Sequence, residues 1–124
     1  MINLFKRIRN QFYKENRAYY KMRRKHRKAL IKLAKEDKDV DWAYMHILLI
    51  TKIRHMYEYF SAGNCVWQTD ETLLPTIEEL KHVLDMQEEM DKEVAGSVIY
   101  IEKRVEQYKE MYEYIGSHML GWWD

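Results

Sequence analysis

The chain has 124 residues, a length that favours one domain, and its single proline and four glycines favour helices over a sheet with many turns. One cysteine, Cys65, excludes an internal disulfide and a cysteine-based metal site, and is typical of a reducing compartment. Residues 1–35 hold thirteen Lys/Arg and one acid (+12), while 36–124 hold eight Lys/Arg and nineteen acids (−11). This asymmetry predicts either a basic partner-binding element or internal pairing of a basic with an acidic helix.

A first helix is predicted over residues 1–36. Its apolar positions step by three and four along one stripe: Phe5, Ile8, Phe12, Tyr19, Met22, Ala29 and Leu33. At its centre, residues 21–28 form a basic cluster in which Arg23, Arg24 and Arg27 are candidate ligand-binding residues. DNA, RNA, an acidic membrane surface or an anionic small molecule would each suit such a cluster. Pairing with an acidic helix, or simple solvation, would explain the same pattern.

Tyrosines alternate with these cations, and Tyr13, Tyr19 and Tyr20 all lie within or beside the basic region. Aromatic rings can stack nucleobases while neighbouring cations hold phosphate. Tyr19 lies on the apolar stripe, however, and we expect it in the core.

A second helix is predicted over residues 39–62, with Asp39 or Asp41 as its cap and Gly63 or Asn64 at its end. Two adjacent stripes predict that this helix is buried over a wide arc of its surface and lies at the centre of the bundle. One stripe is Trp42, Met45, Leu49, Ile53, Met56 and Phe60, and the other is Tyr44, Leu48, Lys52, His55 and Tyr59. A lysine there needs a carboxylate partner, a path to water, or a bound anion. Tyr44, Lys52 and His55 are therefore the candidate pocket residues.

A third, acidic helix is predicted over 70–95 and a fourth over 97–120. Pro75 suits the first turn of the third helix, and Thr76 with Glu79 has the spacing of a capping box. The fourth helix carries a heptad pattern that suits antiparallel bundle packing or a short coiled coil: Val98, Ile101, Val105, Tyr108, Tyr112, Ile115 and Met119. Trp122 and Trp123 are expected in core or interface packing.

No catalytic residue, metal ligand set or cofactor is predicted. Glu79 and His82 form one Glu-x-x-His motif, whereas di-iron bundles use two such motifs and two further glutamates, and the remaining histidines are scattered. Charges at Lys6 and Arg7 interrupt any signal-like apolar segment, and the longest apolar run, 42–50, is shorter than the roughly 20 residues that span a bilayer. We therefore expect an all-α, four-helix bundle-like single domain over 1–124, with a long basic N-terminal helix and no membrane partner.

The second helix and the last residues share a pattern made of Trp42, Tyr44, Leu48, Leu49, Lys52, Met56, Tyr59, Phe60 and the terminal Trp122-Trp123-Asp124. In this pattern they resemble small all-helical proteins of tailed bacteriophages. The basic N-terminal helix departs from that pattern, and the following helix lacks the alanines common there. The resemblance implies a phage accessory protein that acts in the cytoplasm of the host bacterium.

Some phage proteins of similar size sequester nucleotide immune signals, and this analogy supplies the leading hypothesis. It is a non-enzymatic, homo-oligomeric binder of an anionic nucleotide, with Tyr44, Lys52 and His55 joined by Arg23, Arg24 and Arg27. One alternative is a nucleic-acid-binding accessory protein that uses the basic helix around residues 17–28. Another is a protein–protein inhibitor of a host factor, or a structural subunit.

Overall fold

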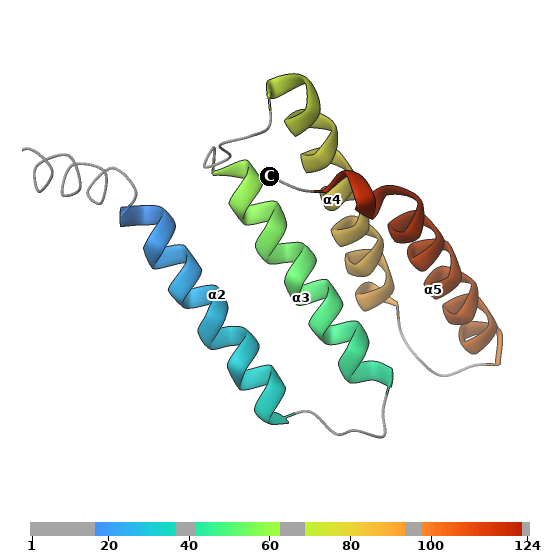
Figure 1. Ribbon diagram of the computed structural model, residues 1–124. Helices are drawn as coiled ribbons and strands as arrows, with labels where there is room; N and C mark the ends of the chain where they lie inside the picture. Colours follow the sequence, from blue (N-terminus) through green and yellow to red (C-terminus); the bar gives the residue numbers. More distant parts are fainter. Residues whose placement is uncertain (1–16, 37–41, 63–68, 94–97, 123–124) are drawn as a thin grey trace, which may run out of the picture. The chain divides into compact units, whose positions relative to one another are not determined.

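The computed structural model describes residues 17–36, 42–62, 69–93 and 98–122, which are almost entirely helical (Figure 1). In chain order the elements are α2 (Arg17–Glu36), α3 (Trp42–Ser61), α4 (Asp70–Lys92), α5 (Val98–His118) and the short 3-10 helix η1 (Met119–Gly121). No strand occurs in these four stretches. The predicted all-α, four-helix bundle-like fold is confirmed.

The observed helix ends lie close to the expected ones. The helix predicted over 39–62 runs from Trp42 to Ser61, and the one predicted over 70–95 runs from Asp70 to Lys92. The helix predicted over 97–120 ends at His118 and continues as η1. Residues 1–16 of the long basic helix and the caps predicted at Asp39, Asp41, Gly63 and Asn64 lie outside the described residues.

The place of Pro75 and Thr76 within α4 differs from the sequence-based expectation. The helix begins at Asp70, with Thr69 as its N-cap, so Pro75 stands in the second turn and not in the first. Thr76 is buried, and its hydroxyl donates to the carbonyl oxygen of Thr72 over 3.1 Å, so it does not form a capping box with Glu79. The expectation failed because Asp70 and Glu71 favour the positive end of the helix dipole and extend the helix toward the N-terminus.

The chain divides into two compact units, residues 1–48 and 49–124. A single domain over 1–124 stays a prediction. The second unit contains the hydrophobic core, which is formed by the last part of α3, by α4 and α5, and by the residue after η1. Its members are Ile50, Ile53, Phe60, Leu80, Val83, Met90, Met111, Ile115 and Trp122. Three- and four-residue spacing places these side chains on one face of each helix, so their burial stabilises the unit.

Polar contacts join α5 and η1 to α4. The Trp122 indole Nε1–H donates to Oε2 of Glu79 over 2.8 Å, and the predicted core packing of Trp122 is confirmed. At the other end, Lys103 Nζ lies 2.8 Å from Oε1 of Glu93, and the Gln107 amide donates to the same oxygen over 3.0 Å. The hydrogen bond from Lys103 lowers the pKa of the Glu93 carboxyl below its usual range.

Several predicted inward-facing side chains are exposed. In α3, the inner stripe is confirmed at Ile53 and Phe60, but Trp42 and Met45 are 57% and 74% exposed. In α5, Ile115 of the heptad is buried, whereas Ile101, Val105, Tyr112 and Met119 are exposed. Helical spacing therefore identified the apolar arcs correctly but not which part of each arc is buried.

Candidate anion-binding surface

Helix α2 is basic along its whole length. Its twenty residues contain nine lysines and arginines and one acid, and most are strong helix formers. None of them is fully buried. The half-buried positions follow the predicted apolar stripe and include Tyr19, Tyr20, Met22, His26, Ala29, Leu30 and Leu33. The cations occupy the remaining, exposed positions, so the helix presents a surface of positive potential.

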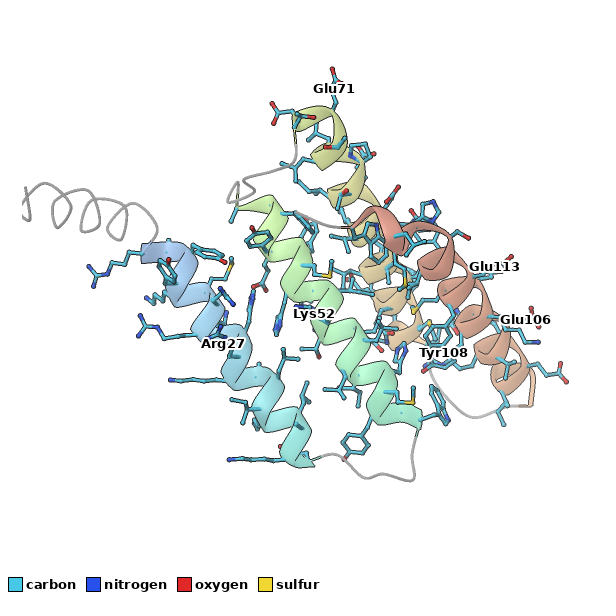
Figure 2. All side chains as sticks on the ribbon, viewed as in Figure 1. Arg27, Lys52, Glu71, Glu106, Tyr108 and Glu113 are labelled. Atoms are coloured by element: carbon cyan, nitrogen blue, oxygen red, sulfur yellow. The ribbon has the colours of Figure 1, made fainter. Side chains whose placement is uncertain are left out.

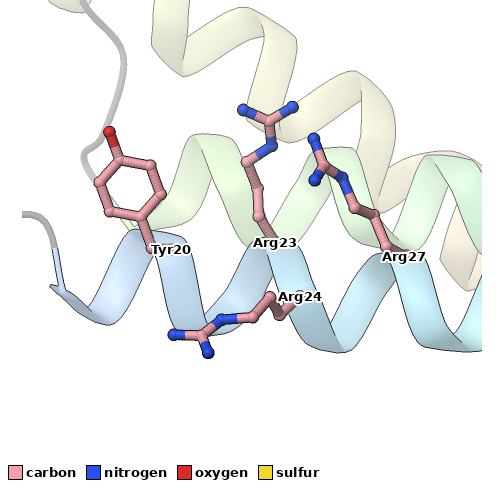
Figure 3. Close-up of a pocket in the computed structure, with 4 residues that line it drawn as sticks. All are labelled: Tyr20, Arg23, Arg24 and Arg27. Atoms are coloured by element: carbon pink, nitrogen blue, oxygen red, sulfur yellow. The ribbon is translucent and has the colours of Figure 1, made fainter.

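Four α2 side chains line an open recess of about 250 Å³: Tyr20, Arg23, Arg24 and Arg27 (Figure 3). Positions three, four and seven residues apart share one side of a helix, so the sequence spacing alone brings these residues together. The predicted ligand residues Arg23, Arg24 and Arg27 thus lie at one site. Tyr20, Arg23 and Arg27 extend to one side of α2, whereas Arg24 runs along the helix toward its N-terminal end (Figure 3).

Tyr19 positions one of these arginines. The Arg23 guanidinium donates to the Tyr19 hydroxyl over 3.4 Å, and its central carbon lies 5.9 Å from the centre of the Tyr19 ring. The rings of Tyr19 and Tyr20 are 5.3 Å apart and tilted by 56°. These contacts favour a restricted set of Arg23 conformations, and a cation that is already oriented loses less entropy when it binds an anion.

The lining residues determine which ligand chemistry fits. A guanidinium group offers a planar fork of donors that matches two phosphate oxygens, and three of them meet at this recess. A tyrosine face beside them can stack on a nucleobase. The four side chains carry no carboxylate, imidazole or thiol, so the arrangement suits binding of a phosphate-containing ligand and offers no acid–base pair.

The three candidates on α3 do not line this recess. Tyr44 is half-buried and falls in the first unit, while Lys52 and His55 fall in the second. Lys52 is exposed and projects from α3 (Figure 2). The expected cost of burying its charge does not arise, because the ammonium remains in water. His55 is buried, only 9% exposed. That these three residues bind a ligand together stays a prediction.

Tyr20 was missing from the predicted set of ligand residues, although it had been considered as a stacking residue. The signal was its spacing of three and seven residues from Arg23 and Arg27, which places all three on one side of a helix.

The two residues of the Glu-x-x-His motif make packing contacts. Glu79 accepts the hydrogen bond of Trp122, and the His82 ring lies 4.5 Å from that of Tyr114. Among the residues described, no three or more His, Cys, Asp or Glu side chains are grouped so that they could hold a metal ion. In the same residues, no helix is both long enough and apolar enough to cross a membrane.

Comparison of the sequence with family models and curated proteins, and of the fold with solved structures, found no match. The resemblance to phage proteins therefore stays a prediction.

Proposed function

We propose that this chain is a non-enzymatic protein that binds the phosphate backbone of nucleic acid through α2. The observation that carries the proposal is the clustering of Arg23, Arg24 and Arg27 at one recess, on a helix whose other cations are also exposed. A helix of this length extends about 30 Å at 1.5 Å per residue, and can follow several successive phosphates.

The shape of the recess favours a polymer over an enclosed small molecule. Its volume of about 250 Å³ lies just below the ~300–1,000 Å³ typical of pockets that enclose a small ligand, and it is open to solvent. The exposed cations continue beyond it: Arg17, Lys21, Lys25, Lys28, Lys32 and Lys35. A chain of phosphates uses such an extended surface, and Tyr20 favours a strand with unpaired bases on which it can stack.

A second candidate is a nucleotide binder, such as a phage protein that sequesters an immune signal in the host cytoplasm. The composition of the recess favours this candidate. Its one aromatic ring can stack on the base of a single nucleotide, and its three guanidinium groups can bind the phosphate. In this function the chain acts as a homo-oligomer, and Lys52 stays a predicted ligand residue.

The test is fluorescence anisotropy with a labelled single-stranded oligonucleotide at several salt concentrations. Each neutralised phosphate contributes about −0.7 to the slope of log K against log salt on a single strand. The variant Arg23→Gln/Arg24→Gln/Arg27→Gln should bind more weakly and make the slope shallower by about 2.

The control removes the same charge elsewhere on the molecule. Arg54→Gln/Lys81→Gln/Lys92→Gln changes exposed cations of α3 and α4 and should leave the slope within about 0.5 of wild type. Equal losses in the two triple variants, or no binding by the wild type, would refute the proposal. Titration calorimetry with cyclic dinucleotides tests the second candidate, which requires tight binding with a small salt slope that Lys52→Ala weakens.

A further inference from the structure

Helix α5 carries an apolar face that its own unit leaves exposed. Ile101 is 63% exposed, Val105 47% and Tyr112 38%, and Tyr108 between them is half-buried. Their spacing of four, three and four residues forms one continuous stripe of the kind found in coiled coils. The Tyr108 and Tyr112 rings lie parallel within 17°, with centroids 6.2 Å apart, and extend this face.

The core of the unit uses a neighbouring arc of the same helix. Met111 and Ile115 are buried in the core, and Gln107 donates to Glu93 beyond α4. Glu106 and Glu113 project from another side of α5 (Figure 2). The exposed stripe therefore lies between the core-facing side of the helix and a charged side. In coiled coils, the apolar contact surface is likewise flanked by charged residues.

We propose that this stripe is the contact surface between two copies of the chain, with the two α5 helices antiparallel about a twofold axis. A twofold interface uses the same patch on both subunits, so the patch must complement itself. The inference is independent of ligand binding by α2, because the two surfaces share no residue.

The charges beside the stripe select the antiparallel orientation. Glu102 and Lys109 flank it on one side, and both are exposed. In a parallel pair, heptad geometry would place Arg104 of one copy beside Lys109 of the other, and these like charges repel. In an antiparallel pair, Glu102 of each copy faces Lys109 of the other, which gives two opposite-charge contacts.

The same charges select one register. Sliding the helices by one heptad would bring Glu102 against its own equivalent, or Lys109 against its own, and both contacts repel. In the favourable register, Ile101 faces the second copy's Tyr112 and Val105 faces the second copy's Tyr108. This register places segment 101–112 of one copy opposite the same segment of the other, so every position of the stripe meets another position of the stripe.

The test measures the mass of the full chain in solution by sedimentation equilibrium. The wild type should be a dimer, and Val105→Glu, which introduces a charge into the central layer, should abolish it. Ile101→Glu, at a more exposed position, is a second variant with the same expected outcome. Circular dichroism should be unchanged, since both positions lie outside the core.

Charge exchange then tests orientation and register. Glu102→Lys and Lys109→Glu should each weaken the dimer by at least about tenfold, because the twofold axis places each substitution in two contacts. The double variant Glu102→Lys/Lys109→Glu should restore wild-type affinity. A monomeric wild type, a dimer that resists Val105→Glu and Ile101→Glu, or a double variant that restores nothing would each overturn the proposal.

Discussion

Trp122 joins η1 to α4 through two kinds of contact. Its ring is buried against the core, 8% exposed, and its indole N–H donates to a Glu79 carboxylate oxygen over 2.8 Å. A buried indole whose N–H had no acceptor would lose its hydrogen bond to water without replacement. Glu79 therefore supplies the acceptor that allows the Trp122 ring to be buried without losing a hydrogen bond of its N–H group. The Glu79 charge also contributes to the raised pKa of the Tyr114 hydroxyl, after the larger effect of desolvation.

We expect Trp122→Phe and Glu79→Ala to be coupled. The charged acceptor should give the pair a coupling energy of about 1–2 kcal/mol in a double-mutant cycle, measured by urea unfolding. The cycle removes the separate contribution of the smaller Phe ring. Pairing Trp122→Phe with Glu78→Ala, an exposed neighbour, is the control and should show additive effects. Equal coupling in the two cycles would contradict a specific role for the indole hydrogen bond.

At the scale of the helices, residue spacing predicted the four segments and those of their ends that lie within the described residues, because amphipathic periodicity is a local property. It did not predict that Trp42 and Met45 are exposed while His46 is buried. A wide apolar arc can turn either of its edges inward, and the choice depends on the packing of distant elements. For the same reason, spacing along α2 grouped Arg23, Arg24 and Arg27, but it carries no information on whether residues of α3 join them.

Pro75 offers a direct test of the helix boundary. In the second turn of α4 it removes a donor that would bond to the carbonyl of Glu71. Pro75→Ala should therefore raise the free energy of unfolding by about 1–3 kcal/mol, measured by urea denaturation. Leu74→Ala, a similarly exposed neighbour, should change it by no more than about 0.5 kcal/mol. Destabilisation by Pro75→Ala would indicate that the proline stands in the first turn of α4, as expected from the sequence.

On the scale of the whole molecule, the hydrophobic core and the cluster of positive charge lie in different parts of the chain. The buried hydrophobic side chains of the described residues all lie in the unit 49–124, whereas α2 has no buried residue and nine of the cations. Amides open locally with free energies that follow burial and packing, so the two parts of the chain should differ in protection.

Hydrogen exchange followed by mass spectrometry should show this difference. Amides of α2 should exchange at least about tenfold faster than those around Leu80 and Val83, which are fully buried. Saturating single-stranded nucleic acid should slow exchange in α2 selectively, and the variant Arg23→Gln/Arg24→Gln/Arg27→Gln should not show this slowing. Uniform protection along the chain would contradict the assignment of the core to the second unit.

The position of the recess on a helix without a buried residue also bears on how such a protein can evolve. Substitutions at Arg23, Arg24 or Arg27 change the proposed ligand surface without opening a cavity in the core. Selection for a new ligand can therefore act on α2 while the residues that maintain the fold stay unaltered. Descendants of this chain can diverge in binding specificity and share one architecture.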